Sequence, residues 1–233
     1  MPVIALNVPR IRKLVSGKTT RKQILDALPF LGLDIESEDG DKIRVEYSPN
    51  RPDYSTEFGI ALGLQGLMEI KKGIQKINIK KSGKFSIKVD SSVTKIRPYV
   101  TGIIARNGTL DNADIQQLMW MQEDLHDGIG RKRLKSSIGL HDADKISFPL
   151  TYSTISREHK FAPLNSNVEQ TIDEILTNTE VGQNYGWVLG DTKRVPIITD
   201  SEQNTISFPP IINSALTTVT PNTKNILIEV TGI

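Results

Sequence analysis

The alternation of apolar and polar positions predicts a small αβ module in the first 75 residues. A helix is predicted after Thr20, because Gln23 completes a capping box and apolar residues then recur at helical spacing. Residues 42–47 alternate as a strand. A second helix is predicted from about Ser55 to Lys72, with Gly73 at the position of a C-terminal cap.

The pattern changes after a lysine- and glycine-containing stretch, residues 76–84, which we predict to be a linker. From residue 85 to 233, short alternating runs predict strands with few helices between them. The longest helix begins after Asp111 and ends in the basic loop DGIGRKR. The prediction is therefore an α+β protein, with an αβ module over 1–75, a linker over 76–84 and a mixed-sheet domain over 85–233.

Composition narrows the class of protein. The chain has no cysteine, which excludes disulfides, thiolate metal sites and a cysteine nucleophile. No stretch reaches the roughly 18 apolar residues of a membrane span, and the amino terminus lacks the apolar core of a signal peptide. We therefore expect a soluble, cytoplasmic protein without a membrane partner. The net charge of +2 is too small to indicate a nucleic-acid partner by itself, although positive charge gathers in two runs, at 71–84 and 131–135.

Most catalytic templates do not occur in the sequence. It contains no GxxxxGK[ST], no GxGxxG and no GxSxG. Its three histidines lie in different predicted elements without metal-ligand spacing, so no metal site is predicted. His141 differs from the other two, because it ends a predicted strand and is followed at once by Asp142. A strand end that leads into a polar loop is a place where side chains project into clefts.

The last segment of the chain holds further candidates. Pro209 and Pro210 stop the strand that begins at Thr205, because neither can donate a hydrogen bond to a ladder. The backbone after them is predicted to leave the sheet and to present polar residues in a loop, namely Asn213, Ser214, Thr217 and Thr218. Glu229 lies inside the apolar strand NILIEV. Its carboxylate either faces solvent or faces a pocket, where it would accept a hydrogen bond from an ammonium or hydroxyl group.

Several segments, in order along nearly the whole chain, resemble the β subunits of phenylalanyl-tRNA synthetases of the archaeal and eukaryotic type. They are PNRPDYSTEFGIALGLQG, KIRPYV, MQEDLH, GRKR, SIGLHDADKI, KFAPLN and SFPPIIN…NTKNILIEVTG. NRPD alone is a weak signal, but the ordered set is specific. The resemblance implies an amino-terminal module followed by an editing domain, which in this family hydrolyses tyrosine mistakenly attached to phenylalanine tRNA.

The resemblance also implies roles for individual residues. The aminoacyl pocket would be formed by Ile198, Ser207, Asn213 and Glu229. His141 and Asn213 would serve catalysis: His141 or a tRNA hydroxyl would orient the attacking water, and backbone amides near Asn213 would stabilise the oxyanion. The GRKR segment would face the tRNA, with Arg131, Lys132 and Arg133 as its tRNA contacts.

The family further implies the partners of this chain. The substrate would be phenylalanine tRNA with an aminoacylated 3′ end, and the α subunit would be its partner in a heterotetramer. The adenylate is made on the α subunit with ATP and magnesium, so no cofactor is expected here. The chain would be the amino-terminal part of a longer subunit. Two alternatives stay open: a non-catalytic tRNA-binding and assembly module, and a stand-alone deacylase that acts on tRNA in trans.

Overall fold

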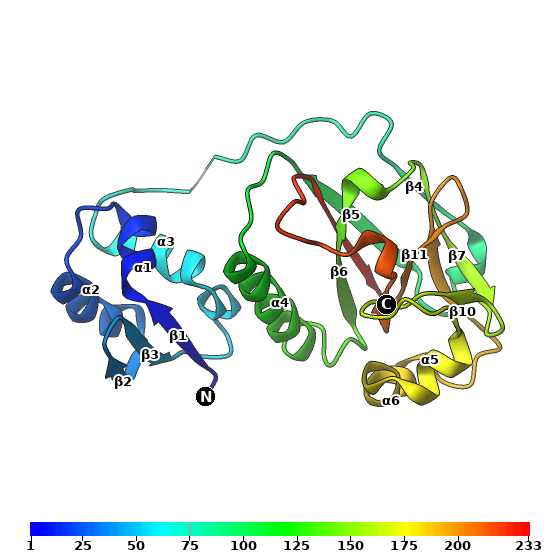
Figure 1. Ribbon diagram of the computed structural model, residues 1–233, viewed down its shortest axis with the longest axis horizontal. Helices are drawn as coiled ribbons and strands as arrows, with labels where there is room; N and C mark the ends of the chain where they lie inside the picture. The colour runs from blue at the N-terminus through cyan, green and yellow to red at the C-terminus, as the bar shows by residue number, and fades with distance from the viewer. Residues whose placement is uncertain (75) are drawn as a thin grey trace. The chain divides into compact units, whose positions relative to one another are not determined.

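The chain forms two units in a computed structural model that describes residues 1–74 and 76–233 (Figure 1). The first unit comprises Met1–Ile79 and Gln116–Gly128, and the second comprises Lys80–Ile115 and Ile129–Ile233. The division after Ile79 falls inside the predicted linker. Residues 116–128, however, were predicted as part of the second domain and cluster with the first unit instead.

The first unit is a small antiparallel sheet with helices on one face (Figure 1). The strand order is β1-β3-β2, with β1 at Val3–Asn7, β2 at Asp34–Asp39 and β3 at Lys42–Glu46. The helices are α1 (Val8–Val15), α2 (Arg21–Ala27) and α3 (Glu57–Leu67). Alternate residues of β1 and β3 enter a core with the buried faces of these helices, formed in part by Leu6, Ile11, Ile24, Val45, Ile60 and Leu64. The capping box of Thr20 and Gln23 at the start of α2 is confirmed.

The helix α3 is shorter than the sequence predicts. It ends at Leu67 rather than near Lys72. Glu69 adopts the left-handed conformation, with φ of 57°, and the amide of Ile70 donates to the carbonyl of Gln65 at 2.9 Å. This hydrogen bond closes a Schellman motif, so Glu69 takes the role that the sequence assigned to Gly73.

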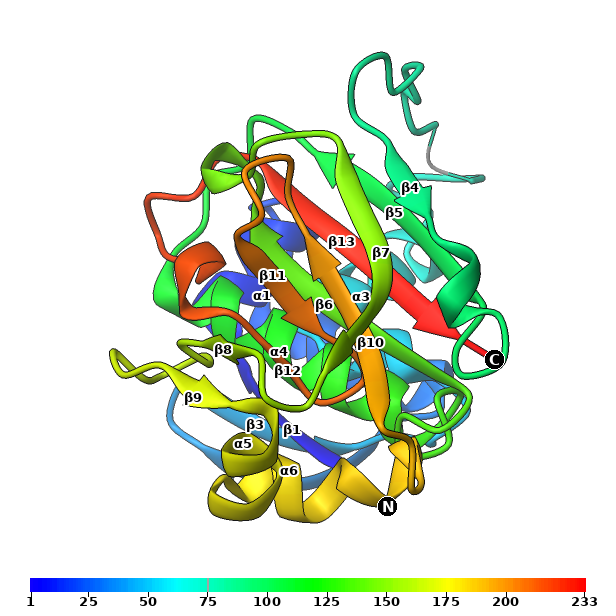
Figure 2. The ribbon, with the colours of Figure 1, turned by 90° about the vertical axis from the view of Figure 1, so that its right-hand side faces the viewer.

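The second unit contains two sheets that face each other across a shared core (Figure 2). The five-stranded sheet has the order β12-β11-β10-β7-β4, and the three-stranded sheet has the order β5-β13-β6. Their strands are β4 (Ile87–Val89), β5 (Tyr99–Ala105), β6 (Ser136–Asp142), β7 (Leu150–Ser156), β10 (Arg194–Thr199), β11 (Thr205–Phe208), β12 (Ile212–Asn213) and β13 (Ile226–Gly232). Leu227 of β13 packs in one core cluster with Tyr152, Ile198 and Ile206 of the larger sheet.

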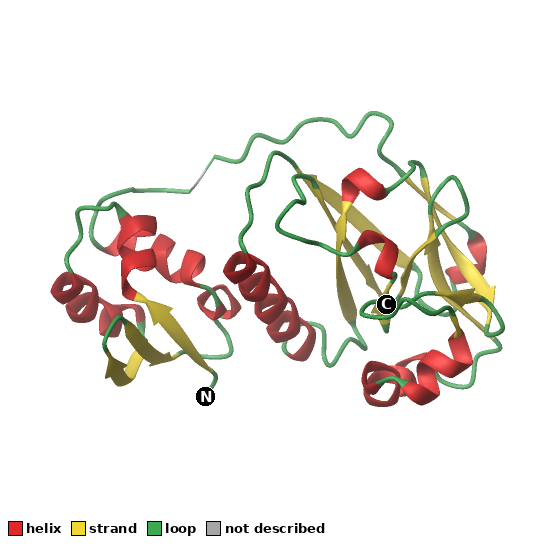
Figure 3. Cartoon of the chain, viewed as in Figure 1, coloured by secondary structure: helices red, strands yellow, loops and turns green. Residues whose placement is uncertain are grey.

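A second core cluster lies on the opposite face of the larger sheet. There Val195 and Ile197 of β10 pack with Ile172 and Ile175 of α5 (Ile172–Asn178). The remaining α-helices are α4 (Asn112–Asp127), which runs across the boundary of the two units, and α6 (Glu180–Tyr185). The remaining strands, β8 (Lys160–Phe161) and β9 (Gln170–Thr171), pair with each other. Helices and strands occur in both units (Figure 3), so the predicted α+β class is confirmed.

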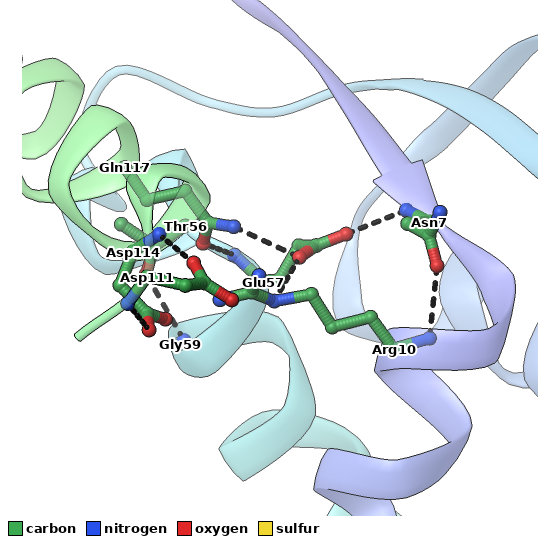
Figure 4. Close-up of polar contacts among 8 residues, drawn as sticks. All are labelled: Asn7, Arg10, Thr56, Glu57, Gly59, Asp111, Asp114 and Gln117. Atoms are coloured by element: carbon green, nitrogen blue, oxygen red, sulfur yellow. Dashed lines mark hydrogen bonds and ion pairs between the residues drawn. The ribbon is translucent and has the colours of Figure 1, made fainter. Parts of the chain in front are cut away.

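A buried carboxylate joins three helices of the first unit (Figure 4). Glu57 is 3% exposed. It accepts hydrogen bonds from the backbone amide of Asn7 at 2.5 Å and from the side-chain amide of Gln117 at 2.8 Å, and it forms an ion pair with Arg10 at 2.9 Å. The Gln117 side chain in turn accepts from the Glu57 amide at 2.8 Å. The carboxylate thus ties the starts of α1 and α3 to α4.

We expect Glu57→Ala to destabilise the first unit by about 3 kcal/mol, because it breaks a buried ion pair and leaves buried donors without their acceptor. The fluorescence of the two tryptophans can report on the unfolding of the two units separately, since Trp120 belongs to the first unit and Trp187 to the second. Urea unfolding is followed by Trp120 fluorescence in a Trp187→Phe background. Glu69→Ala is the matched control, because the Glu69–Lys72 pair is on the surface and is expected to contribute less than about 1 kcal/mol. Equal effects of the two substitutions would contradict the prediction.

Candidate functional site

Polar side chains from four strands meet between the two sheets of the second unit. They are His141 of β6, Ser207 of β11, Asn213 of β12 and Glu229 of β13, and together we call them the buried polar site. The Ser207 hydroxyl lies 3.2 Å from Oε1 of Glu229 and 3.1 Å from Oδ1 of Asn213, and it can donate to either. His141, Ser207 and Glu229 are at most 2% exposed.

Strand register explains why these residues meet. In the β13–β6 ladder, Glu229 lies opposite Gly139 and Leu227 lies opposite His141. Side chains alternate along a strand, so all four residues are on the same face of the sheet. Leu227 marks this face as the one that packs on the larger sheet. Of the two interpretations that the sequence left open for Glu229, the solvent-facing one is therefore wrong.

Two polar atoms in this site lack a hydrogen-bond partner among the residues that the structure describes. They are Oε2 of Glu229 and Nε2 of His141, and both are buried. Nδ1 of His141 is 2.9 Å from the hydroxyl of Thr217, which fixes the ring. Nε2 then points toward Glu229, 3.9 Å from Oε1. Because buried polar groups are nearly always paired, this convergence indicates a place for a polar ligand or for water.

Glycines flank Glu229 on both neighbouring strands, with Gly139 opposite it on β6 and Gly102 opposite it on β5. A Cβ atom built on Gly139 would lie 2.5 Å from Oε1 of Glu229 and 2.6 Å from Nε2 of His141. The absence of a side chain at Gly139 therefore allows both polar groups to pack directly against its backbone. Gly139 was not predicted as a site residue, because its role depends on the register of two strands that are distant in sequence.

Ile198 and Asn213 complete the immediate surroundings of Ser207. Ile198 lies opposite Ser207 in the β10–β11 ladder and belongs to the core between the sheets. Asn213 lies opposite Ser207 in the β11–β12 ladder, and its Nδ2 donates to the carbonyl of Leu140 at 3.3 Å. The prediction that Asn213 lies in a loop is wrong. The strand does end at Phe208 before the two prolines, but a tight turn brings the chain straight back as β12.

The basic loop divides into two exposed cations and one buried cation. Arg131 and Lys132 are exposed, whereas Arg133 is 7% exposed. The Arg133 guanidinium donates to the carbonyl of Ile211 at 2.8 Å and lies 4.1 Å from the ring centroid of Tyr185. All three basic residues have positive φ values, of 50°, 53° and 64°. The inward contacts of Arg133 hold this strained turn, so Arg131 and Lys132 are the two cations that the loop presents to solvent.

A separate cavity of about 240 Å³ lies in the first unit, lined by β1, Trp120 and a few polar side chains. Among the polar ones, the hydroxyl of Tyr47 donates to the carboxylate of Asp124. Burial, together with this bond, raises the pKa of Tyr47 above its ordinary value. Since these two groups satisfy each other, the cavity lacks the unpaired, convergent groups of the buried polar site.

Within residues 1–74 and 76–233, no group of three or more His, Asp or Glu side chains is arranged to hold a metal ion. Over the same residues, none of the helices combines the length and the apolar character needed to cross a bilayer.

The part of the chain that carries the buried polar site has known relatives. Residues 129–233 match the B3/4 domain family, and this segment contains all four residues of the buried polar site. Over the whole chain, the sequence is 41% identical to the phenylalanine–tRNA ligase β subunit of Methanocorpusculum labreanum, covering 43% of that protein. It is 40% identical to the corresponding subunit of Archaeoglobus fulgidus, covering 42% of it.

A solved structure agrees with these relatives. An amino-terminal fragment of the phenylalanyl-tRNA synthetase β subunit from Pyrococcus horikoshii superposes with a TM-score of 0.90 at 33% identity, over 99% of this chain and 68% of that one. The chain belongs to the phenylalanine–tRNA ligase β-subunit family, as its sequence motifs indicated. It spans about two fifths of the length of the curated relatives.

Proposed function

We propose that this chain hydrolyses tyrosine from mischarged phenylalanine tRNA, with the buried polar site as the aminoacyl pocket. The observation that carries the proposal is the pair of unpartnered buried atoms, Oε2 of Glu229 and Nε2 of His141. A site with a free acceptor between apolar walls is suited to an aromatic side chain that ends in a hydroxyl group. Its place in the B3/4 domain of a synthetase β subunit supports an aminoacyl-tRNA as the substrate.

Glu229 would supply the discrimination between tyrosine and phenylalanine. A site that hydrogen-bonds a substrate hydroxyl can reject the analogue without it by about ten-thousandfold, because the buried acceptor is then left unpaired. Ser207 already holds Oε1 of Glu229 at 3.2 Å, which leaves Oε2 to accept from the phenol. Ile198 would contribute an apolar wall beside the ring.

Hydrolysis of an aminoacyl ester needs an oriented water and donors for the oxyanion rather than a protein nucleophile. Thr217 fixes the ring of His141 from one side, so that Nε2 would orient the water from the other. Asn213 would serve the oxyanion, through nearby backbone amides or through Nδ2, whose 3.3 Å bond to Leu140 is long enough to be exchanged.

The remaining parts of the proposal concern the whole enzyme. The tRNA would meet the basic loop, where Arg131 and Lys132 are exposed for phosphate contacts. Within a complete ligase, this chain would belong to a β subunit that works with an α subunit. The aminoacylation reaction, with ATP and magnesium, would take place on the α subunit and not at the buried polar site.

The direct test is the release of amino acid from phenylalanine tRNA charged with tyrosine or with phenylalanine. We expect the chain to release tyrosine at least about a hundredfold faster than phenylalanine, and a variant with both His141→Ala and Glu229→Ala to lose this activity. Release of tyrosine no faster than in buffer would refute the hydrolytic function. Tight tRNA binding without release would instead identify a non-catalytic tRNA-binding module.

A further inference from the structure

A second buried charge lies close to the site and takes no part in the chemistry proposed above. Arg97 precedes β5 and is 2% exposed. Its guanidinium donates to the hydroxyl of Thr231 at 2.9 Å, to the carbonyl of Thr231 at 2.8 Å and to the hydroxyl of Ser137 at 3.2 Å, and also to the carbonyl of Leu134 at 3.1 Å. All these acceptors are neutral, and none of the carboxylates that the structure describes forms a direct ion pair with Arg97. A buried guanidinium requires a countercharge.

The strand register places a carboxylate, that of Glu229, two residue pairs away from the residues that hold Arg97. Thr231 follows Glu229 by two residues on β13, and Ser137 precedes Gly139 by two residues on β6. Residues two apart on a strand share a face. The hydroxyls that hold Arg97 therefore line the same face as Glu229, and they are 2.9 Å from each other. The guanidinium of Arg97 donates to both hydroxyls of this pair.

The electrostatics of the surrounding groups agree with this placement. Burial lowers the pKa of Arg97, while the negative charge of Glu229 works in the opposite direction. Burial also raises the pKa of Tyr152, whose hydroxyl donates to the carbonyl of Arg97 at 2.7 Å and so remains neutral. His141 and Asp142, which are both buried, are further titratable groups near the site. Arg97 and Glu229 are its pair of opposite charges.

We propose that Arg97 is a positioning residue of the buried polar site, and that its charge holds the Glu229 carboxylate in place to receive the hydroxyl of tyrosine. Arg97 does not touch the substrate; it acts through Glu229, with the Ser137 and Thr231 hydroxyls fixing the guanidinium. This inference rests on the proposed function. It explains how a carboxylate with an unpartnered oxygen is stabilised in a buried position.

Binding of non-hydrolysable analogues tests the role apart from catalysis. The probes are adenosines that carry tyrosine or phenylalanine on a 3′-amide, and affinities are measured by calorimetry. We expect Arg97→Met to lower the affinity for the tyrosine analogue by at least about tenfold, as for loss of a charge-assisted hydrogen bond. The affinity for the phenylalanine analogue is expected to fall much less. Arg97→Lys retains the charge and is expected to recover most of the preference. In a Glu229→Gln background, Arg97→Met is expected to change the preference no further.

The matched control is Arg194→Met, since Arg194 also binds the hydroxyl and carbonyl of a neutral residue, Thr154, but lies outside the buried polar site. It is expected to leave the preference unchanged. Arg97→Met could lower the affinities for both analogues equally, or change their ratio in the Glu229→Gln background as much as in the unsubstituted chain. In either case Arg97 has a structural role alone and the inference is wrong.

Stability provides a second route that does not depend on substrate. Arg97→Met alone leaves the Glu229 charge without its countercharge and is expected to lower the melting temperature. The double variant with Glu229→Gln, which removes both charges, is expected to melt at a higher temperature than Arg97→Met. A double variant no more stable than the single one would overturn the coupling of the two charges. Coupling without any tyrosine preference in the unsubstituted chain would instead count against the proposed function.

Discussion

Gly139→Ala is expected to lower tyrosyl-tRNA hydrolysis by at least about a hundredfold, because misplacement of reacting groups by about 1 Å has effects of this size. The new methyl group would lie 2.5 Å from Glu229 Oε1 and 2.6 Å from His141 Nε2. Both groups would have to move away from the positions in which they are proposed to act on the substrate. Single-turnover deacylation of tyrosyl-tRNA measures the effect, and the melting temperature shows whether the fold is retained.

Gly102→Ala is the matched control for this substitution. Gly102 also lies opposite Glu229, on β5 instead of β6. A Cβ there would meet the tips of Ile87 and Leu227 at 3.3 and 3.4 Å, and both side chains can adjust. We expect its activity to stay within about threefold of the unsubstituted chain, well under the effect of lost positioning. Equal losses in both variants would mean that the space over Gly139 is not the aminoacyl pocket.

Glu229→Gln is expected to reduce the preference for tyrosine over phenylalanine by about 10- to 100-fold, the range for losing a hydrogen bond to a charged group. The amide retains the shape of the carboxylate, but it removes the charge that would accept the phenol. The rate with phenylalanyl-tRNA is expected to change little, because phenylalanine has no hydroxyl to donate. Rates with both charged tRNAs, measured side by side, provide the ratio.

Glu202→Gln serves as the control for the loss of one negative charge. Glu202 lies in the exposed turn between β10 and β11 and accepts from the Ser147 hydroxyl at 2.9 Å. It is expected to leave the tyrosine preference unchanged. A preference in Glu229→Gln equal to that of this control would remove Glu229 from the recognition of substrate.

Local sequence signals predicted those elements that short-range contacts create. The capping box at Thr20 involves a residue three positions on, and it is present. The strands β11 and β13 also lie where strands were predicted, from Thr205 and in the segment NILIEV. The strand β1 and helix α1 were not predicted, because Val3–Asn7 runs directly into Val8–Val15 and the change of period from strand to helix occurs without a turn.

The placement of the site residues depended on contacts that a sequence does not display. Alternation assigned Glu229 to one side of its strand, but which side meets the larger sheet is decided by packing. Arg133 belongs to a basic run that suggested solvent, and its burial depends on Ile211 and Tyr185, which are distant in sequence. Arg97 could be found only through its hydrogen bonds to Thr231, 134 positions away.

The central position of β13 has a consequence for synthesis of the protein. This strand pairs with both β5 and β6, which precede it by about 120 and 90 residues. Until Ile226–Gly232 leaves the ribosome, neither neighbour has its partner, and Glu229 is not yet in the site. Most of the first unit is complete far earlier in translation. The second unit must therefore fold late and through long-range pairing, which is the slow kind, and its nascent strands need protection from aggregation for most of that time.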